Sequence, residues 1–106
     1  MRGSDECWTL GDEALRAEPV GRSGPRGGVV GRLEALANEI GVPPKTLRIY
    51  RGIAWAWPKT KRRKSLPFGV HAVFRSEPDR YELIRQEDWT TATARAFLKQ
   101  RRLDKG

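Results

Sequence analysis

The spacing of apolar residues along the chain is that of helices. No alternation of apolar and polar positions lasts for more than a few residues, so no strand is expected. The pattern predicts an all-α fold, a small bundle of about five helices. Residues 1–8 lack periodicity and are expected to form a flexible N-terminus. Residues 9–98 are expected to form a single helical domain, and residues 99–106 a basic tail.

A first helix is expected from about Leu10 to Glu18. Thr9 and Asp12 stand at the spacing of a capping box at its start, and Pro19 ends it.

Residues 21–28 contain four glycines and one proline, a composition typical of a flexible connector. Arg22 and Arg26 lie within this segment. The alternative interpretation is an arm whose two arginines reach a nucleic-acid backbone or a minor groove.

Two consecutive helices are predicted between about residues 32 and 57. Gly41 ends the first, and Pro44 can open the second because the N–H that proline lacks has no partner in a first turn. The expected inward face of the first helix is Leu33, Leu36, Ala37 and Ile40. The expected inward face of the second is Leu47, Tyr50, Ala54 and Trp57.

Later helices are expected to begin at Pro67, after Ser76 and Asp79, and after Trp89 and Thr90. His71 lies in an apolar stretch and is expected to be a core-edge histidine bonded to a backbone carbonyl, not a catalytic group. Trp57 and Trp89 are expected in the core. Trp55 is expected to pack against the helix over residues 67–74, and Cys7 to have no role.

Charge changes this picture because it is unevenly distributed. The chain has 21 Lys and Arg against 13 Asp and Glu, a formal net charge of +8. Residues 41–76 hold nine basic residues and no acidic one. A block of one sign attracts an anionic surface, so a polyanion is the expected partner.

Several classes of protein are excluded. The length of 106 residues suits one small domain. Its apolar runs are far shorter than the roughly 20 residues that span a bilayer, so no membrane partner is expected. No signal segment opens the chain, and a cytoplasmic, nucleoid-associated protein is expected. One cysteine and one histidine cannot make a four-ligand zinc site. Neither a catalytic set nor a phosphate-cradling glycine loop is recognisable, so no enzyme, cofactor or small-molecule substrate is expected.

Residues 32–57 have the spacing of a helix-turn-helix. Ala37 supplies a small residue where the two helices cross, Gly41 supplies the turn, and Val42 plugs it. Leu47 and Tyr50 then anchor the second helix to the first.

In such a motif the second helix enters the major groove of DNA. The expected base contacts are Pro44, Lys45, Arg48 and Ile49. Arg48 is the candidate for a bidentate bond to guanine, and it is expected to lack a carboxylate partner because this helix has none. The expected phosphate contacts are Thr46, Arg51, Lys59, Lys61, Arg62, Arg63 and Lys64.

Residues 32–58 (RLEALANEIGVPPKTLRIYRGIAWAWP) resemble the helix-turn-helix of ParB- and KorB-type partition proteins. They resemble more closely a family of ParB-like DNA-binding proteins of actinobacteria and their phages. Similar matches are Leu10–Leu15, Leu66–Phe74, Ser76–Asp79, Trp89-Thr90 and Ala94-Arg95, so the resemblance covers most of residues 9–98. It implies DNA binding by the helix that starts near Pro44. The nucleotide-binding and dimerisation domains of partition proteins have no counterpart in this sequence, so CTP hydrolysis is not implied.

The expected function is binding of double-stranded DNA, as a small transcriptional regulator or a plasmid or phage accessory factor. One alternative is a small phage-type protein that binds an acidic host protein. Another is a binder of single-stranded nucleic acid that uses Trp55 and Tyr50. A homodimer formed through Phe97, Leu98 and Leu103 is a further possibility.

Overall fold

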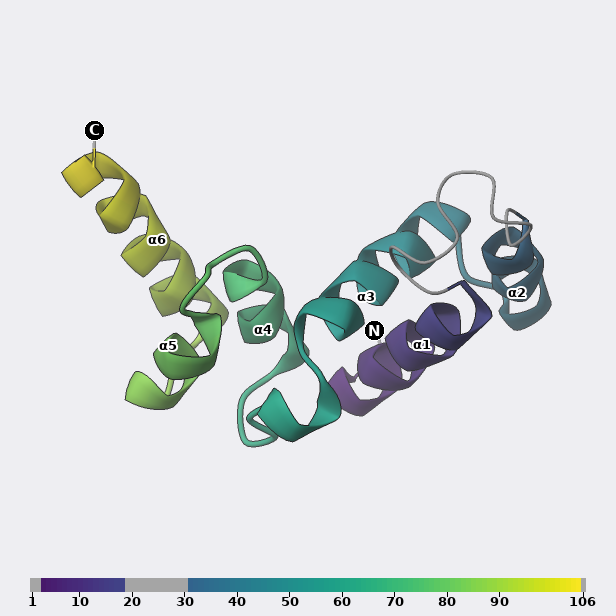
Figure 1. The fold of residues 1–106 in the computed structure, drawn as a ribbon, viewed down its shortest axis with the longest axis horizontal. Coiled ribbons are helices and arrows are strands. Elements are labelled where there is room, and N and C mark those ends of the chain that lie inside the picture. Colours follow the sequence, from purple (N-terminus) through teal and green to yellow (C-terminus); the bar gives the residue numbers. More distant parts are fainter. Residues whose placement is uncertain (1–2, 19–30, 106) are drawn as a thin grey trace. The chain divides into compact units, whose positions relative to one another are not determined.

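The structure, a computed structural model, describes residues 3–18 and 31–105 (Figure 1). In these ranges the chain forms six α-helices and one 3-10 turn and has no strand, which confirms the all-α prediction. The chain divides into two compact units, Met1–Ala56 and Trp57–Gly106, where the sequence predicted one domain. The expected connector, with Arg22 and Arg26, lies outside the described residues.

The first unit begins with α1, which spans Ser4–Ala17. The prediction of a flexible stretch up to residue 8 is wrong from Ser4 onward. Acidic Asp5 and Glu6 occupy the first turn, where their negative charges interact favourably with the positive end of the helix dipole. Thr9 is not a cap, because its hydroxyl donates a hydrogen bond to the Asp5 carbonyl one turn earlier, at 2.9 Å. Cys7 is buried, so it is part of the packing of α1.

The second helix, α2 (Arg32–Ile40), ends as predicted at Gly41, which adopts the left-handed conformation with φ +75°. The next amide, that of Val42, donates to the Ala37 carbonyl at 2.9 Å. This bond and the burial of Ala37 and Val42 form a Schellman motif with its apolar contact. Ile40, predicted to face inward, is 39% exposed.

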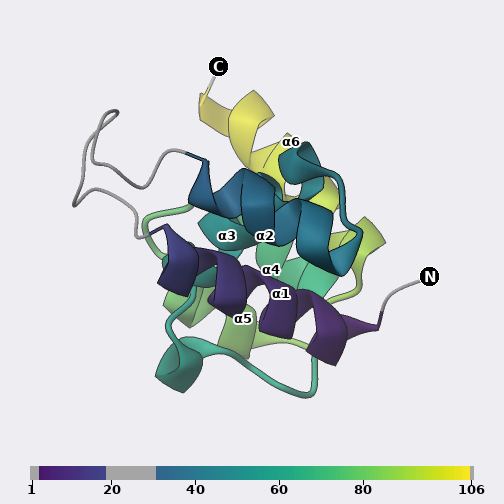
Figure 2. The same cartoon turned by 90° about the vertical axis from the view of Figure 1, so that its right-hand side faces the viewer.

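The third helix, α3, spans Pro44–Ala56, close to its predicted bounds. It lies beside α1 and runs in the opposite direction, and α2 packs against both (Figures 1 and 2). The layer among the three helices is made of Ala14, Leu33, Ala37, Val42 and Leu47. Half-buried Leu10 and Leu36 complete it.

Gly11 permits the close approach of α1 to α3. A Cβ atom built at Gly11 would lie 2.6 Å from the carbonyl oxygen of Tyr50 and 3.1 Å from the Cβ of Ala54. Any side chain here would push the two helices apart. The sequence predicted Ala37 as the small residue where α2 and α3 cross, but it did not predict the close approach of α1 to α3 at Gly11.

The second unit contains η2 (Lys59–Lys61), α4 (Phe68–Phe74), α5 (Arg80–Gln86) and α6 (Thr91–Lys105). Trp57 and Trp89 are buried, as predicted. Each indole N–H donates to a carbonyl, that of Trp57 to His71 at 2.9 Å and that of Trp89 to Leu83 at 2.7 Å. Phe74 packs edge-on against Trp89, with 5.0 Å between ring centroids. These contacts satisfy the polar edges of the indoles while their rings fill the core.

Two helix ends of this unit differ from expectation. The predicted basic tail is helical, because α6 continues to Lys105. Asp79 occupies the N-cap position of α5 but makes no side-chain cap bond, and Ser76 is exposed and precedes the helix by several residues. Thr90 does cap α6: its hydroxyl accepts the Thr93 amide at 3.1 Å, and the Thr93 hydroxyl accepts the Thr90 amide at 2.8 Å.

Candidate nucleic-acid interface

The outward face of α3 combines cationic and apolar side chains. Lys45, Arg48, Ile49 and Trp55 are exposed and follow one another at helical spacing. Ile49 is 46% and Trp55 56% exposed, high values for large apolar residues. Trp55 was expected to pack against the helix over residues 67–74, and more than half of its surface is exposed. The opposite face of α3 is buried.

The buried face of α3 holds the helix against α1 and α2. Leu47 and Ala54 are buried as predicted, and Tyr50 is half-buried. Ile53 is also buried and was not predicted to be. Because this face is fixed by packing, Lys45 and Arg48 are directed away from the core of the unit.

The first turn of α3 has no acidic residue. Pro44 and Thr46 are half-buried there, and Lys45 is exposed. The first amides of a helix have no carbonyl partner within it and carry the positive end of the helix dipole. The start of α3 is therefore electropositive in both its backbone and its side chains.

Arg48 has a carboxylate partner, which corrects the expectation that it has none. Its Nη2 donates to Oε2 of Glu34, on α2, at 3.0 Å. The Arg48 and Glu34 side chains are 51% and 53% exposed. An ion pair this exposed contributes about 0–1 kcal/mol. Arg48 can therefore exchange this partner for another at small cost.

Arg51 was predicted to contact phosphate, but it has a structural bond. Its Nη1 donates to the backbone carbonyl of Glu18, just beyond the end of α1, at 2.7 Å. The side chain is half-buried, and its Nε atom is buried without a hydrogen-bond partner in the described part of the chain. A guanidinium at the end of a helix satisfies a carbonyl that has no intrahelical donor. Arg51 thus ties α3 to α1.

The basic segment Lys59–Lys64 separates into two classes of residue. Lys59, Lys61 and Lys64 are exposed, and their contact with phosphate stays a prediction. Arg62 and Arg63 are half-buried and donate to backbone carbonyls of their own unit. The guanidinium groups of Arg62 and Arg63 were expected to be free to bind phosphate, but both are bonded within their own unit.

Arg63 makes the larger set of contacts. Its Nη1 donates to the carbonyls of Ile84 at 3.0 Å and Glu87 at 2.9 Å, and its Nη2 pairs with Asp88 at 2.6 Å. Arg62 donates from Nε to the Trp57 carbonyl at 2.7 Å. Arg63 thus fastens the basic segment to the end of α5.

His71 has the backbone-carbonyl partner that the sequence predicted, but it lies inside the core and not at its edge. It is fully buried, with Nδ1 3.0 Å from the Pro67 carbonyl and Nε2 accepting the Arg63 amide at 3.1 Å. These partners require a neutral ring with the proton on Nδ1. Burial lowers the pKa of His71, and the charge of nearby Arg62 acts in the same direction, against the raising effect of the Pro67 bond.

Residues 77–106 hold seven basic and six acidic residues, and the fold pairs some of these charges and leaves others exposed. Arg101 donates to Glu77 at 2.8 Å and to both carboxylate oxygens of Asp79 at 3.1 Å. The hydrogen bond from Arg101 lowers the pKa of Asp79. Acidic side chains are thereby neutralised on one side of α6. The basic residues that remain exposed on this helix include Arg95, Lys99 and Arg102.

The sequence contained the signal for these residues. Arg95, Lys99 and Arg102 stand four and three positions apart, which is the spacing of one helix face. They were missed because residues 99–106 were interpreted as a tail, and because neighbouring acidic residues balanced their charge.

The expected dimer surface on the last helix is only partly available. Leu98 is buried within the unit, and half-buried Phe97 packs edge-on against Trp89. Leu103 is exposed.

No model of a known protein family, no curated protein and no solved structure matches the chain. None of the helices that the structure describes is long and apolar enough to cross a membrane. In the same residues, no group of three or more histidine, cysteine or carboxylate side chains is arranged to hold a metal ion.

Proposed function

We propose that the protein binds double-stranded DNA, with α2 and α3 as a helix-turn-helix and the first half of α3 in the major groove. The observation that carries the proposal is the pair of opposed faces of α3. Leu47 is fully buried on one, whereas Lys45 and Arg48 are exposed on the other. A helix with one face fixed in a core and a cationic face open suits insertion into a polyanionic groove.

The connection between the helices supports the same proposal. Three residues, Gly41 to Pro43, separate α2 from α3, and a turn of three or four residues that contains glycine is typical of helix-turn-helix motifs. The left-handed conformation of Gly41 and the Schellman bond from Val42 define this turn. The resemblance of residues 32–58 to ParB-like proteins points to the same role.

Residues along α3 would divide the task of recognition. Arg48 can release Glu34 and present two N–H groups to the O6 and N7 atoms of a guanine, a contact worth about 1–3 kcal/mol of discrimination. Ile49 can contact a thymine methyl group. Lys45 and the first amides of the helix suit a phosphate. A role as a small transcriptional regulator or a plasmid or phage accessory factor follows from such binding.

The test begins with selection of bound duplexes from a random pool, followed by fluorescence anisotropy on the selected site. Arg48→Ala should lower the affinity for this site about 5- to 150-fold and leave the affinity for unrelated duplexes within a few fold. Arg16→Ala is the matched control, since Arg16 also forms an exposed ion pair in this unit, with Glu13, but lies on α1. Equal effects of the two substitutions would contradict the proposal.

The guanine contact has its own test. Replacing each guanine of the selected site by 7-deazaguanine removes one acceptor in the major groove. At one position this replacement should lower the affinity of the wild-type protein for the duplex, and it should not lower the affinity of Arg48→Ala any further. An additive loss at every guanine would show that Arg48 does not read these bases.

A second candidate function is supported by the exposed apolar residues of the same face. Ile49 and Trp55 are large, apolar and open, and aromatic residues are enriched in protein interfaces. They favour the alternative of an acidic protein partner. The selection separates the two: a protein-binding face would yield no consensus sequence, and its weak retention of DNA would be equal for all duplexes.

A further inference from the structure

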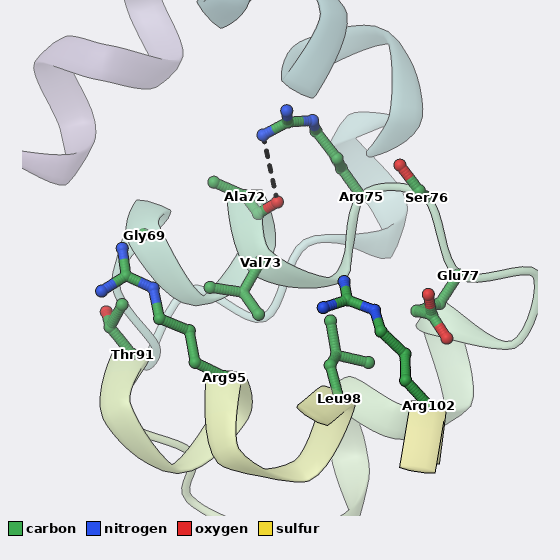
Figure 3. Close-up of a pocket in the computed structure, with 10 residues that line it drawn as sticks. All are labelled: Gly69, Ala72, Val73, Arg75, Ser76, Glu77, Thr91, Arg95, Leu98 and Arg102. Atoms are coloured by element: carbon green, nitrogen blue, oxygen red, sulfur yellow. Dashed lines mark hydrogen bonds between the residues drawn. The ribbon is translucent and has the colours of Figure 1, made fainter. Parts of the chain in front are cut away.

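An open groove lies between α4 and α6 of the second unit (Figure 3). Apart from Leu98, which was expected in a dimer surface, its lining residues belong to no site predicted from the sequence. Its volume is about 560 Å³. Its polar lining consists of Arg75, Ser76, Glu77, Thr91, Arg95 and Arg102. In Figure 3, Arg95 and Arg102 extend from α6 toward α4, with Leu98 between them.

The groove is positively charged after internal pairing is taken into account. Arg95 and Arg102 are exposed and make no hydrogen bond or ion pair with the residues that the structure describes. Among the described residues, the Arg75 guanidinium donates one long bond, 3.4 Å, to the Ala72 carbonyl. The carboxylate in the lining, Glu77, is held by Arg101 at 2.8 Å. The lining of the groove therefore contains three guanidinium groups and one carboxylate, and that carboxylate is already neutralised by Arg101.

The spacing of the cations favours an extended anion over a single phosphate. Arg95 and Arg102 are seven positions apart on one helix, which separates their backbone positions by about 10 Å. The phosphates of one DNA strand recur every 3.4 Å or so along the axis, so the two arginines suit different phosphates. Exposed Lys99 lies between them in the sequence and on the same face of α6.

We propose that this groove binds the phosphodiester backbone of duplex DNA, with Arg95 and Arg102 each contacting a different phosphate. Arg75 and the Thr91 hydroxyl provide further donors along the groove. The inference rests on the proposed DNA-binding function and adds a second contact surface to it. A lone helix-turn-helix contacts few base pairs, so its affinity for DNA is low. A separate contact with phosphates raises this affinity.

The test uses the full chain and measures affinity for duplex DNA as a function of salt. Each phosphate contact contributes about 0.9 to the slope of log affinity against log salt, so Arg95→Gln with Arg102→Gln should reduce the slope by about two. At 0.1 M salt the affinity of the double variant should fall roughly 10- to 60-fold, equally for all duplex sequences. Because neither arginine has an internal partner, circular dichroism should show an unchanged fold.

Arg85→Gln is the matched control for each single substitution. Arg85 is exposed on α5 of the same unit and does not line the groove. Arg85→Gln removes the same charge as each single substitution, and its slope of log affinity against log salt should stay at the wild-type value. A double variant that matches this control in affinity and slope would overturn the inference. Saturable binding of inorganic phosphate that is lost in Arg95→Gln would also overturn it, since it would show a site for a single phosphate.

This experiment separates the groove from the helix-turn-helix. If Arg48→Ala removes sequence preference and the groove variants behave like Arg85→Gln, the proposed function holds and the groove inference fails. If no duplex is preferred but the groove variants still lower the slope, the groove inference holds and base reading by α3 fails.

Discussion

The contact between α1 and α3 at Gly11 provides a direct test of the packing that fixes the outward face of α3. In Gly11→Ala, the new Cβ would lie 2.6 Å from the Tyr50 carbonyl oxygen, a backbone atom that can move only if the helices separate. Overpacking of this kind costs about 1–3 kcal/mol. The gain in helix propensity from glycine to alanine offsets about 1 kcal/mol of that cost. The free energy of unfolding should therefore fall by up to about 2 kcal/mol.

Gly52→Ala is the matched control. Gly52 is also inside a helix of this unit, but a Cβ atom built there meets nothing within 4 Å. This variant should gain stability by about 0.5–1 kcal/mol, and urea denaturation followed by circular dichroism measures both changes. In a domain of this size, 1 kcal/mol corresponds to about 4–8 °C in Tm. Equal stability of the two variants would refute the close approach at Gly11.

Other predictions concern the second unit. Arg63→Ala should cost about 1–3 kcal/mol, because it leaves two carbonyls without their donor. The exposed neighbour variant Lys64→Ala should keep the stability but lose about 0.9 of the salt slope of DNA binding, and the opposite pattern would contradict both assignments. Because burial lowers the pKa of His71, the unfolded chain takes up its proton first as the pH falls below about 6.5. The contribution of His71 to the free energy of unfolding should therefore decrease below that pH and be constant above it. His71→Gln should lack this decrease in urea titrations at pH 5 to 7. Because Arg101 lowers the pKa of Asp79, Arg101→Gln should raise that pKa in a carboxyl NMR titration. An unchanged Asp79 titration would show that the hydrogen bonds do not persist in solution.

The helices that local chemistry defines could be predicted from the sequence. Gly41 and Pro44 set the end of α2 and the start of α3, and both boundaries are where the spacing predicts them. The start of α1 was misplaced, because Thr9 and Asp12 stand at capping distance while the actual first turn begins at Ser4. Burial of Cys7 and the fit of Gly11 against α3 are tertiary contacts, which a periodicity in one segment does not contain.

The positions of the charges could be predicted, but their partners could not. Nine basic residues lie between positions 41 and 76, and of these Lys45 in the first unit and Lys64 in the second are exposed. Arg51 and Arg63 belong to the same block, yet they donate to carbonyls that are distant in sequence. Conversely, Arg102 lies in a segment of nearly balanced charge, and the fold pairs Glu77, which lines the same groove, with Arg101 instead.

The outward face of α3 is proposed to contact duplex DNA. NMR titration of the ¹⁵N-labelled chain with the selected duplex measures this residue by residue. The largest shifts in the first unit should fall on the amides of Lys45, Thr46, Arg48 and Ile49, with small changes on α1. Binding of the duplex that leaves these amides unchanged, or no binding even at low salt, would contradict DNA binding by this face of α3.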